Sequence, residues 1–193
     1  MNTVLSSPNR VVWEYFFSLR LLVAQAREAP SAELCRQAAA MSIIMAVTVG
    51  EVFFNLWFRV RVEERHTAAE IQSFLRNLSP PYLSLDRKLR QWPQRYLGRP
   101  LDLSAGPGAA FVTLKNMRNA IVHFTSTHES LSLGGVTIHG LADTTEYDNL
   151  SHERASWALQ TTENVVAEVF RLAGLSPESI PRAVHAWSGK VAV

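Results

Sequence analysis

The chain of 193 residues contains a single cysteine, Cys35, so neither an intramolecular disulfide nor a cysteine-based zinc site can form. Its histidines lie in different segments without the spacing of metal ligands, and His152-Glu153 is not followed by a second histidine at zinc-protease spacing. The sequence therefore predicts no metal and no cofactor. The first ten residues lack the basic flank and apolar stretch of a signal peptide, and we expect a cytoplasmic protein.

Other patterns are missing as well. Alternation of polar and apolar residues is nearly absent, which argues against a parallel sheet or a dinucleotide-binding unit. The chain has no glycine-rich phosphate loop and no Gly-x-Ser-x-Gly elbow for a nucleophilic serine. Nineteen Lys and Arg against seventeen Asp and Glu leave a net charge of +2, so a nucleic-acid site would have to come from local clustering.

The longest apolar stretch covers residues 38–58, and it carries Glu51 and Asn55 well inside. An acidic group at that depth in a bilayer is costly, so we expect a helix buried in protein and no membrane insertion. Gly50 in this stretch either weakens the helix or lets a neighbour approach closely.

What is present is ordinary globular composition, with 47% hydrophobic and 19% charged residues. We expect one domain over residues 1–193, with a core of about 9–175 and a tail of 176–193. Helical signals recur along the chain and predict an all-α bundle with one long central helix. The expected helices cover Pro8 to Pro30, 31–64, 67–79, 83–97, 109–126 and 151–173, with a further helical turn at 179–187. Thr67 and Glu70 predict a capping box at the start of one helix, and Pro93 predicts a break or kink in the next. Residues 131–145 are expected to form a hairpin or an irregular excursion.

Residues 111–124 carry the most informative pattern. Leu114, Met117, Ile121 and Phe124 share one helix face and predict a core stripe. A second face holds Lys115, Asn119 and His123, with Arg118 at its flank, so a guanidinium, an amide and an imidazole are expected at one pocket. Such a trio suits phosphodiesters, because Arg matches phosphate oxygens and His can take a proton from a ribose 2′-OH. A solvated polar face is the alternative interpretation.

Arg118, the four residues after it and His123 resemble the signature of the HEPN superfamily. That signature is Arg, four to six residues and His, very often with Asn, Asp or His directly after the Arg, and here Asn119 follows Arg118. The resemblance is specific over about 111–124 and extends loosely over the helix order from about 31 to 173.

The resemblance implies a helical bundle that forms a homodimer, with two motifs facing each other in a composite RNA-cleaving site. Members often act as ribonuclease toxins or phage-defence effectors, for which an antitoxin protein is a further expected partner; others only bind RNA or nucleotides. Some toxin members have a Tyr two residues after the His that a partner enzyme modifies. Thr125 stands there in this chain, which argues against regulation of that kind.

A polar stripe on the long helix gives weaker support. Thr48, Glu51, Asn55 and Arg59 are spaced three, four and four residues apart in otherwise apolar sequence. A buried carboxylate needs a partner, and Arg118 is one choice. A glutamate at this position of the long helix also resembles what is found in HEPN proteins. The alternative is that Glu51 pairs with another bundle residue for structural reasons alone.

A basic and aromatic segment covers residues 86–99. Basic groups contact phosphates and aromatic faces stack on unpaired bases, so the segment predicts RNA binding. The alternative is a basic amphipathic helix with its aromatics turned inward. The expected RNA contacts are Arg87, Lys88, Arg90, Trp92, Arg95, Tyr96 and Arg99, together with Lys115.

The sequence thus predicts a metal-independent endoribonuclease in which Arg118, Asn119 and His123 are catalytic and Glu51 and Asn55 support them. A non-catalytic RNA- or nucleotide-binding module and a plain helical interaction protein are the alternatives. Val122 and Phe111 lie off the core stripe beside the motif, and we expect them at a two-fold dimer contact.

Overall fold

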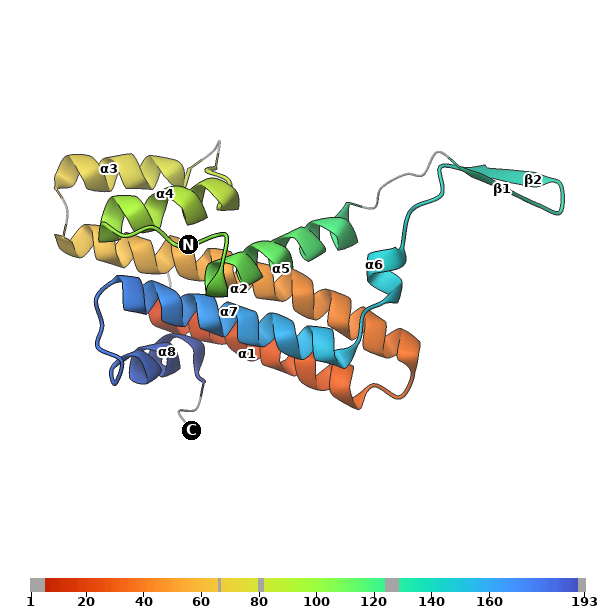
Figure 1. The fold of residues 1–193 in the computed structure, drawn as a ribbon, viewed down its shortest axis with the longest axis horizontal. Coiled ribbons are helices and arrows are strands. Elements are labelled where there is room, and N and C mark those ends of the chain that lie inside the picture. Colours follow the sequence, from red (N-terminus) through yellow and green to blue (C-terminus); the bar gives the residue numbers. More distant parts are fainter. Residues whose placement is uncertain (1–5, 66, 80–81, 124–128, 191–193) are drawn as a thin grey trace, which may run out of the picture.

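The computed structural model describes residues 6–65, 67–79, 82–123 and 129–190, and its architecture is all-α with one small hairpin (Figure 1). This confirms the predicted fold class. In chain order the elements are α1 (Pro8–Glu28), α2 (Ala32–Arg65), α3 (Ala68–Asn77), α4 (Leu85–Leu97), α5 (Gly106–Val122), β1 (Ser130–Leu133), β2 (Val136–His139), α6 (Thr145–Asp148), α7 (His152–Leu172) and α8 (Ile180–Ser188).

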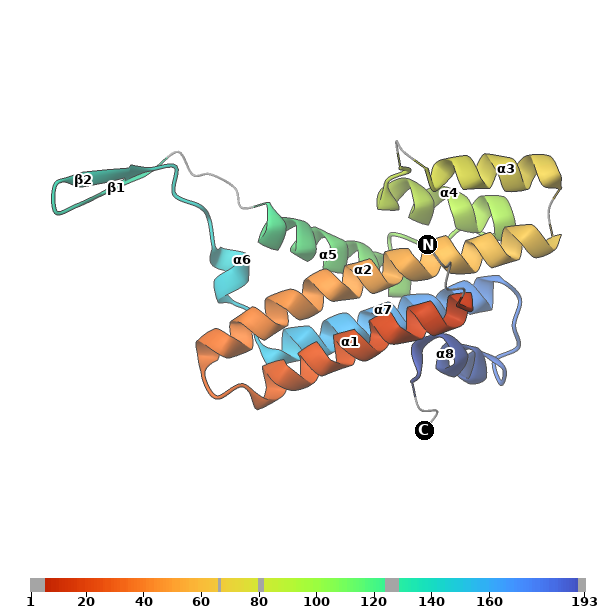
Figure 2. The same ribbon diagram turned by 180° about the vertical axis from the view of Figure 1, so that it is seen from behind.

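The 34-residue helix α2 is the central element, and α1 and α7 lie along it for most of its length (Figures 1 and 2). Among the described helices it alone is long and apolar enough to cross a membrane, but 56% of its apolar 18-residue window is buried inside the protein. Thr162 of α7 donates its hydroxyl to the carbonyl of Ala46 at 3.3 Å, which ties the two helices together. The predicted central helix is therefore confirmed within one residue at each end.

An aromatic cluster fills the half of the bundle where α2, α3 and α4 meet. Phe74 of α3 lies 4.7 Å from Trp92 of α4, measured between ring centroids, and Phe58 of α2 lies 5.7 Å from the same Trp92. All three rings are nearly fully buried. Because each large ring buries much apolar surface, this cluster anchors α3 and α4 to the central helix.

The predicted capping box is present at the start of α3. The Thr67 hydroxyl accepts a hydrogen bond from the backbone N–H of Glu70, and the Glu70 carboxylate accepts one from the backbone N–H of Thr67. By contrast, of the break or kink expected near Pro93 the break is wrong, since α4 runs unbroken from Leu85 to Leu97. Proline removes one helical hydrogen bond, but Leu89, Trp92 and Pro93 itself are buried, and their packing holds the helix together.

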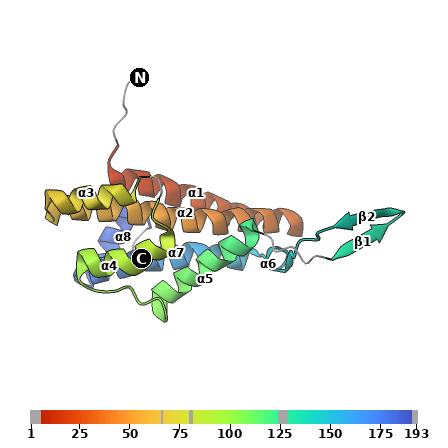
Figure 3. The ribbon, with the colours of Figure 1, turned by 90° about the horizontal axis from the view of Figure 1, so that it is seen from above.

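Helix α5 crosses α2 at close range, because Gly50 leaves room for it. A Cβ atom at Gly50 would lie 2.3 Å from the ring of Phe111, which is fully buried. The sequence left open whether Gly50 weakens α2 or admits a neighbour, and the structure shows the second. Helix α5 lies on the opposite side of α2 from α1 (Figure 3).

After α5 the chain forms the predicted excursion as a two-stranded antiparallel hairpin that extends away from the helices (Figure 1). Every residue of both strands is exposed. Leu131 pairs with Ile138 and Leu133 with Val136, so four apolar side chains share one face of the ribbon.

Candidate functional site

The Arg118 to His123 motif occupies the last turn of α5 and the residue after it. Arg118 is half-buried, and its Nε atom is buried without a hydrogen-bond partner among the described residues. Asn119 and His123 are both exposed, and the Asn119 carbonyl accepts the His123 N–H at 2.8 Å. The motif therefore combines a half-buried guanidinium with an amide and an imidazole that solvent reaches.

His123 is not on the helix, which corrects one expectation. The helix was expected to continue to residue 126, but it ends at Val122, and His123 has φ −117° and ψ 70°. The backbone of His123 has left the helical conformation, so its side chain does not follow the helical wheel. Residues 124–126 of the expected helix, including Phe124 of the core stripe, lie outside the described residues.

The rest of the motif helix only partly follows the expected pattern. Leu114 and Ile121 are buried and Met117 is half-buried, as the core stripe predicts. Val122 is 44% exposed beside the motif and remains available to a partner. Phe111 was expected at the same partner surface, and that is wrong, because its ring is fully buried against Gly50.

Glu51 pairs with Lys88 rather than with Arg118. The Lys88 ammonium donates to the Glu51 carboxylate at 2.6 Å, and the Lys88 side chain is 3% exposed. The sequence left open a structural partner for Glu51, and Lys88 is that partner. The charge of Glu51 is thus matched by a cation of α4, and this contact does not involve Arg118.

The other members of the polar stripe on α2 make polar side-chain contacts only within α2 among the described residues, or none. The Thr48 hydroxyl donates to the Ile44 carbonyl, and Arg59 pairs with Glu63 one turn further on. Asn55 is half-buried, and its Oδ1 atom has no hydrogen-bond partner among the described residues. None of these contacts reaches the motif, so the support expected from Glu51 and Asn55 is not seen within the described part of a single chain.

A second buried lysine repeats this arrangement between α5 and α4. Lys115 is buried and its ammonium donates to the carboxylate of Asp86 at the start of α4. Together Glu51, Asp86, Lys88 and Lys115 form two ion pairs in which buried cations are neutralised by carboxylates. Lys115 was expected on an RNA-binding face, and its burial in one of these pairs corrects that. The sequence carries no signal for this pairing, because it places Lys115 on the polar face of the motif helix and Asp86 lies 29 residues away along the chain.

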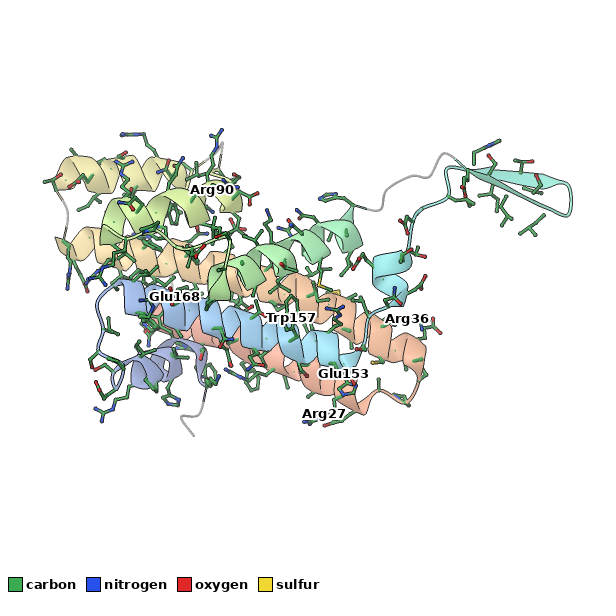
Figure 4. All side chains as sticks on the ribbon, viewed as in Figure 1. Arg27, Arg36, Arg90, Glu153, Trp157 and Glu168 are labelled. Carbon is green, nitrogen blue, oxygen red and sulfur yellow. The ribbon has the colours of Figure 1, made fainter. Side chains whose placement is uncertain are left out.

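The basic segment divides into an inward and an outward half. Trp92 and Tyr96 are 1% and 6% exposed and belong to the aromatic core, and burial raises the pKa of the Tyr96 hydroxyl. Lys88 points inward with them, 5.7 Å from the Trp92 ring. These three cannot contact RNA as expected, because protein atoms occupy their surfaces. The exposed arginines are Arg87, Arg90, Arg95 and Arg99, of which Figure 4 labels Arg90 on α4.

A cavity of about 250 Å³ lies beside the motif helix, where α5 faces α6. It is lined by Thr113, Asn116, Met117, Ala120 and Glu146. Within the described ranges no group of three or more His, Cys, Asp and Glu side chains is placed to hold a metal ion. Comparison of this chain with family models, with curated proteins and with solved structures gives no match.

Proposed function

We propose that the protein is a metal-independent endoribonuclease of the HEPN type, with Arg118, Asn119 and His123 at its site. The observation that carries this proposal is the state of Arg118. Its Nε has no hydrogen-bond partner among the described residues, and the carboxylates of Glu51 and Asp86 already neutralise lysines. The Arg118 guanidinium is half-buried and lies five residues before an exposed imidazole, and a guanidinium and an imidazole together suit a phosphodiester.

The chemistry needs a base and an acid on opposite sides of the phosphorus. The His123 imidazole would take the proton of the ribose 2′-OH, whose oxygen then attacks phosphorus, while the 5′-oxygen leaves and takes up a proton. The products are a 2′,3′-cyclic phosphate and a 5′-hydroxyl. Arg118 would stabilise the charge that develops on the non-bridging oxygens.

One chain places a single imidazole at this motif, so we assign the second proton-transfer group to a second copy of the chain. The exposed Val122 beside the motif provides an apolar contact for such a pairing. A two-fold axis near it would bring each His123 close to its symmetry mate. The exposed arginines of α4 would hold the RNA backbone, in a toxin or phage-defence role.

The test is cleavage of single-stranded RNA by the purified protein in EDTA. His123→Ala should lower cleavage by roughly 10²–10⁴-fold with RNA binding largely retained, as expected for a general base. Arg118→Ala should lower both cleavage and binding, because its charge meets phosphate before and during the reaction. His185→Ala, which changes an exposed histidine on α8, is the matched control and should cleave normally.

A substrate with a 2′-deoxy sugar at the scissile position should bind and resist cleavage. Equal cleavage of that substrate, or a requirement for a divalent ion, would refute the mechanism. RNA that binds without being cut would favour the non-catalytic HEPN interpretation. If the RNA is neither bound nor cut, the result would favour the interpretation as a helical interaction protein.

A further inference from the structure

Helix α1 carries an apolar face that is largely exposed, although the Trp13 ring also packs against Gly189. Its inner face packs in the core through Val12, Phe16, Leu19 and Ala26. On the outer side Trp13, Phe17 and Leu21 recur every fourth residue and are 42%, 48% and 50% exposed. Trp13 stacks on Phe17 with 5.6 Å between ring centroids. An ordered aromatic ridge of this kind is typical of a protein contact.

The ridge leads into a cavity where α1 passes into α2. This cavity measures about 490 Å³, and Leu34 and Met41 on its α2 side are 47% and 50% exposed. Its other lining residues are Leu22, Gln25, Glu28, Ala29, Pro30, Gln37 and Ala38. Gln25 follows Leu21 by one helical turn, so ridge and cavity form one continuous surface.

Charges of opposite sign lie at the two ends of the ridge. Arg10 and Glu28 are about five helical turns apart, which places them on the same side of α1 as the ridge. Their side chains are 69% and 68% exposed, and their bonds are to sequence neighbours, Arg10 to Glu14 and Glu28 to Arg27. Figure 4 shows Arg27 at the end of α1.

We propose that this face binds a second copy of the chain, with the two α1 helices antiparallel about a two-fold axis level with Leu19. In that register Phe17 lies opposite Leu21 of the second copy, and Trp13 lies opposite Gln25 at the rim of the cavity. Arg10 then meets Glu28 of the second copy at both ends, which gives charge complementarity. A bilayer with anionic lipids fits less well, because Glu14 and Glu28 share the face with Arg10.

This contact does not depend on the proposed ribonuclease site, because α1 and α5 lie on opposite sides of α2 (Figure 3). The two assemblies can therefore be separated. Loss of the α1 contact should halve the mass of the assembly and leave cleavage per site unchanged.

The experiment is a charge-reversal cycle followed by light scattering after gel filtration and by sedimentation equilibrium. Arg10→Glu and Glu28→Arg should each lower the association constant of the assembly by roughly tenfold, because the two-fold axis repeats each like-charge contact. The double variant R10E/E28R should recover most of the wild-type affinity. Recovery cannot come from within one helix, since the new acid at position 10 would still face Glu14 and the new base at position 28 would still adjoin Arg27.

A second variant tests the apolar part of the face. Phe17→Glu should halve the mass at concentrations where the wild type is assembled, while its circular dichroism and unfolding midpoint show that it still folds. The proposal is overturned if the double variant is no tighter than the single variants, or if Phe17→Glu leaves the mass unchanged. Flotation with vesicles of phosphatidylglycerol and phosphatidylcholine tests whether the face binds a membrane instead. If Phe17→Glu loses vesicle binding and the mass of its assembly is unchanged, the face is a membrane-binding surface.

Discussion

Replacing Glu51 by Gln should destabilise the protein, and this effect should exceed that of removing its partner. Lys88 is buried at the contact of α2 and α4, and Glu51 is its partner among the described side chains. The substitution removes the negative charge and leaves the ammonium in a place that water barely reaches. An uncompensated buried charge is among the most destabilising changes in a folded protein.

The magnitude follows from the different burial of the two partners. Breaking a fully buried ion pair by removing one member costs about 3–5 kcal/mol. The Glu51 side chain is 36% exposed, so part of the pair is already hydrated. The Gln side chain can still accept a hydrogen bond from Lys88. We therefore expect Glu51→Gln to lower the free energy of unfolding by about 2 kcal/mol.

Lys88→Met is the matched change on the other side of the pair. Methionine keeps the apolar stem that packs near Trp92, and the Glu51 carboxylate can turn toward water. The expected cost is about 1 kcal/mol or less. In the double variant E51Q/K88M neither member of the pair is charged, so its stability should exceed that of Glu51→Gln alone.

Urea unfolding followed by circular dichroism measures all four proteins, and the slope of each transition shows whether two-state behaviour holds. The reasoning fails if Lys88→Met costs more than Glu51→Gln, or if the two losses simply add in the double variant. Either result would mean that Lys88 is not held in the core by the charge of Glu51.

Two further predictions concern α5 and the loop before it. Gly50→Ala should cost about 1–3 kcal/mol through the collision with the Phe111 ring, and adding Phe111→Leu should restore much of that loss in the same urea assay. Hydrogen bonds from the Ser104 hydroxyl and the backbone N–H groups of Ser104 and Ala105 lower the pKa of Asp102 from 3.8. A carboxylate whose pKa is lowered by folding stabilises the fold at pH values above its pKa in the unfolded chain. Asp102→Ala should therefore destabilise the protein at neutral pH. The unfolding curves of the two proteins should converge as the pH falls below 3.8.

The helices were predictable because their signals are local. Pro8, Pro30 and the Thr67/Glu70 box mark helix ends through the backbone hydrogen bonds of a few neighbouring residues. The length and apolar character of α2 likewise require only sequence. The helix does not break at Pro93, because burial of its surroundings is a tertiary property that a local rule does not contain.

The site was less predictable because it depends on which distant charges meet. Lys88 belongs to the basic and aromatic segment and Lys115 to the polar face of the motif helix, yet both are buried against distant carboxylates, at sequence separations of 37 and 29. Nothing in the spacing of a basic helix shows which of its cations point inward. The motif was placed correctly on this helix, but its position at the end of α5 and the departure of His123 from the helix depend on where the last turn stops.

The hairpin after the motif has a consequence for how such a protein can change over time. Among the described elements β1 and β2 pack only against each other, so the bundle loses no core contact when their sequence or length varies. Substitutions there escape the selection on stability that constrains α2 and α7. Within the described residues the hairpin is therefore a part of the chain whose sequence can drift while the scaffold of α2 and α7 stays intact.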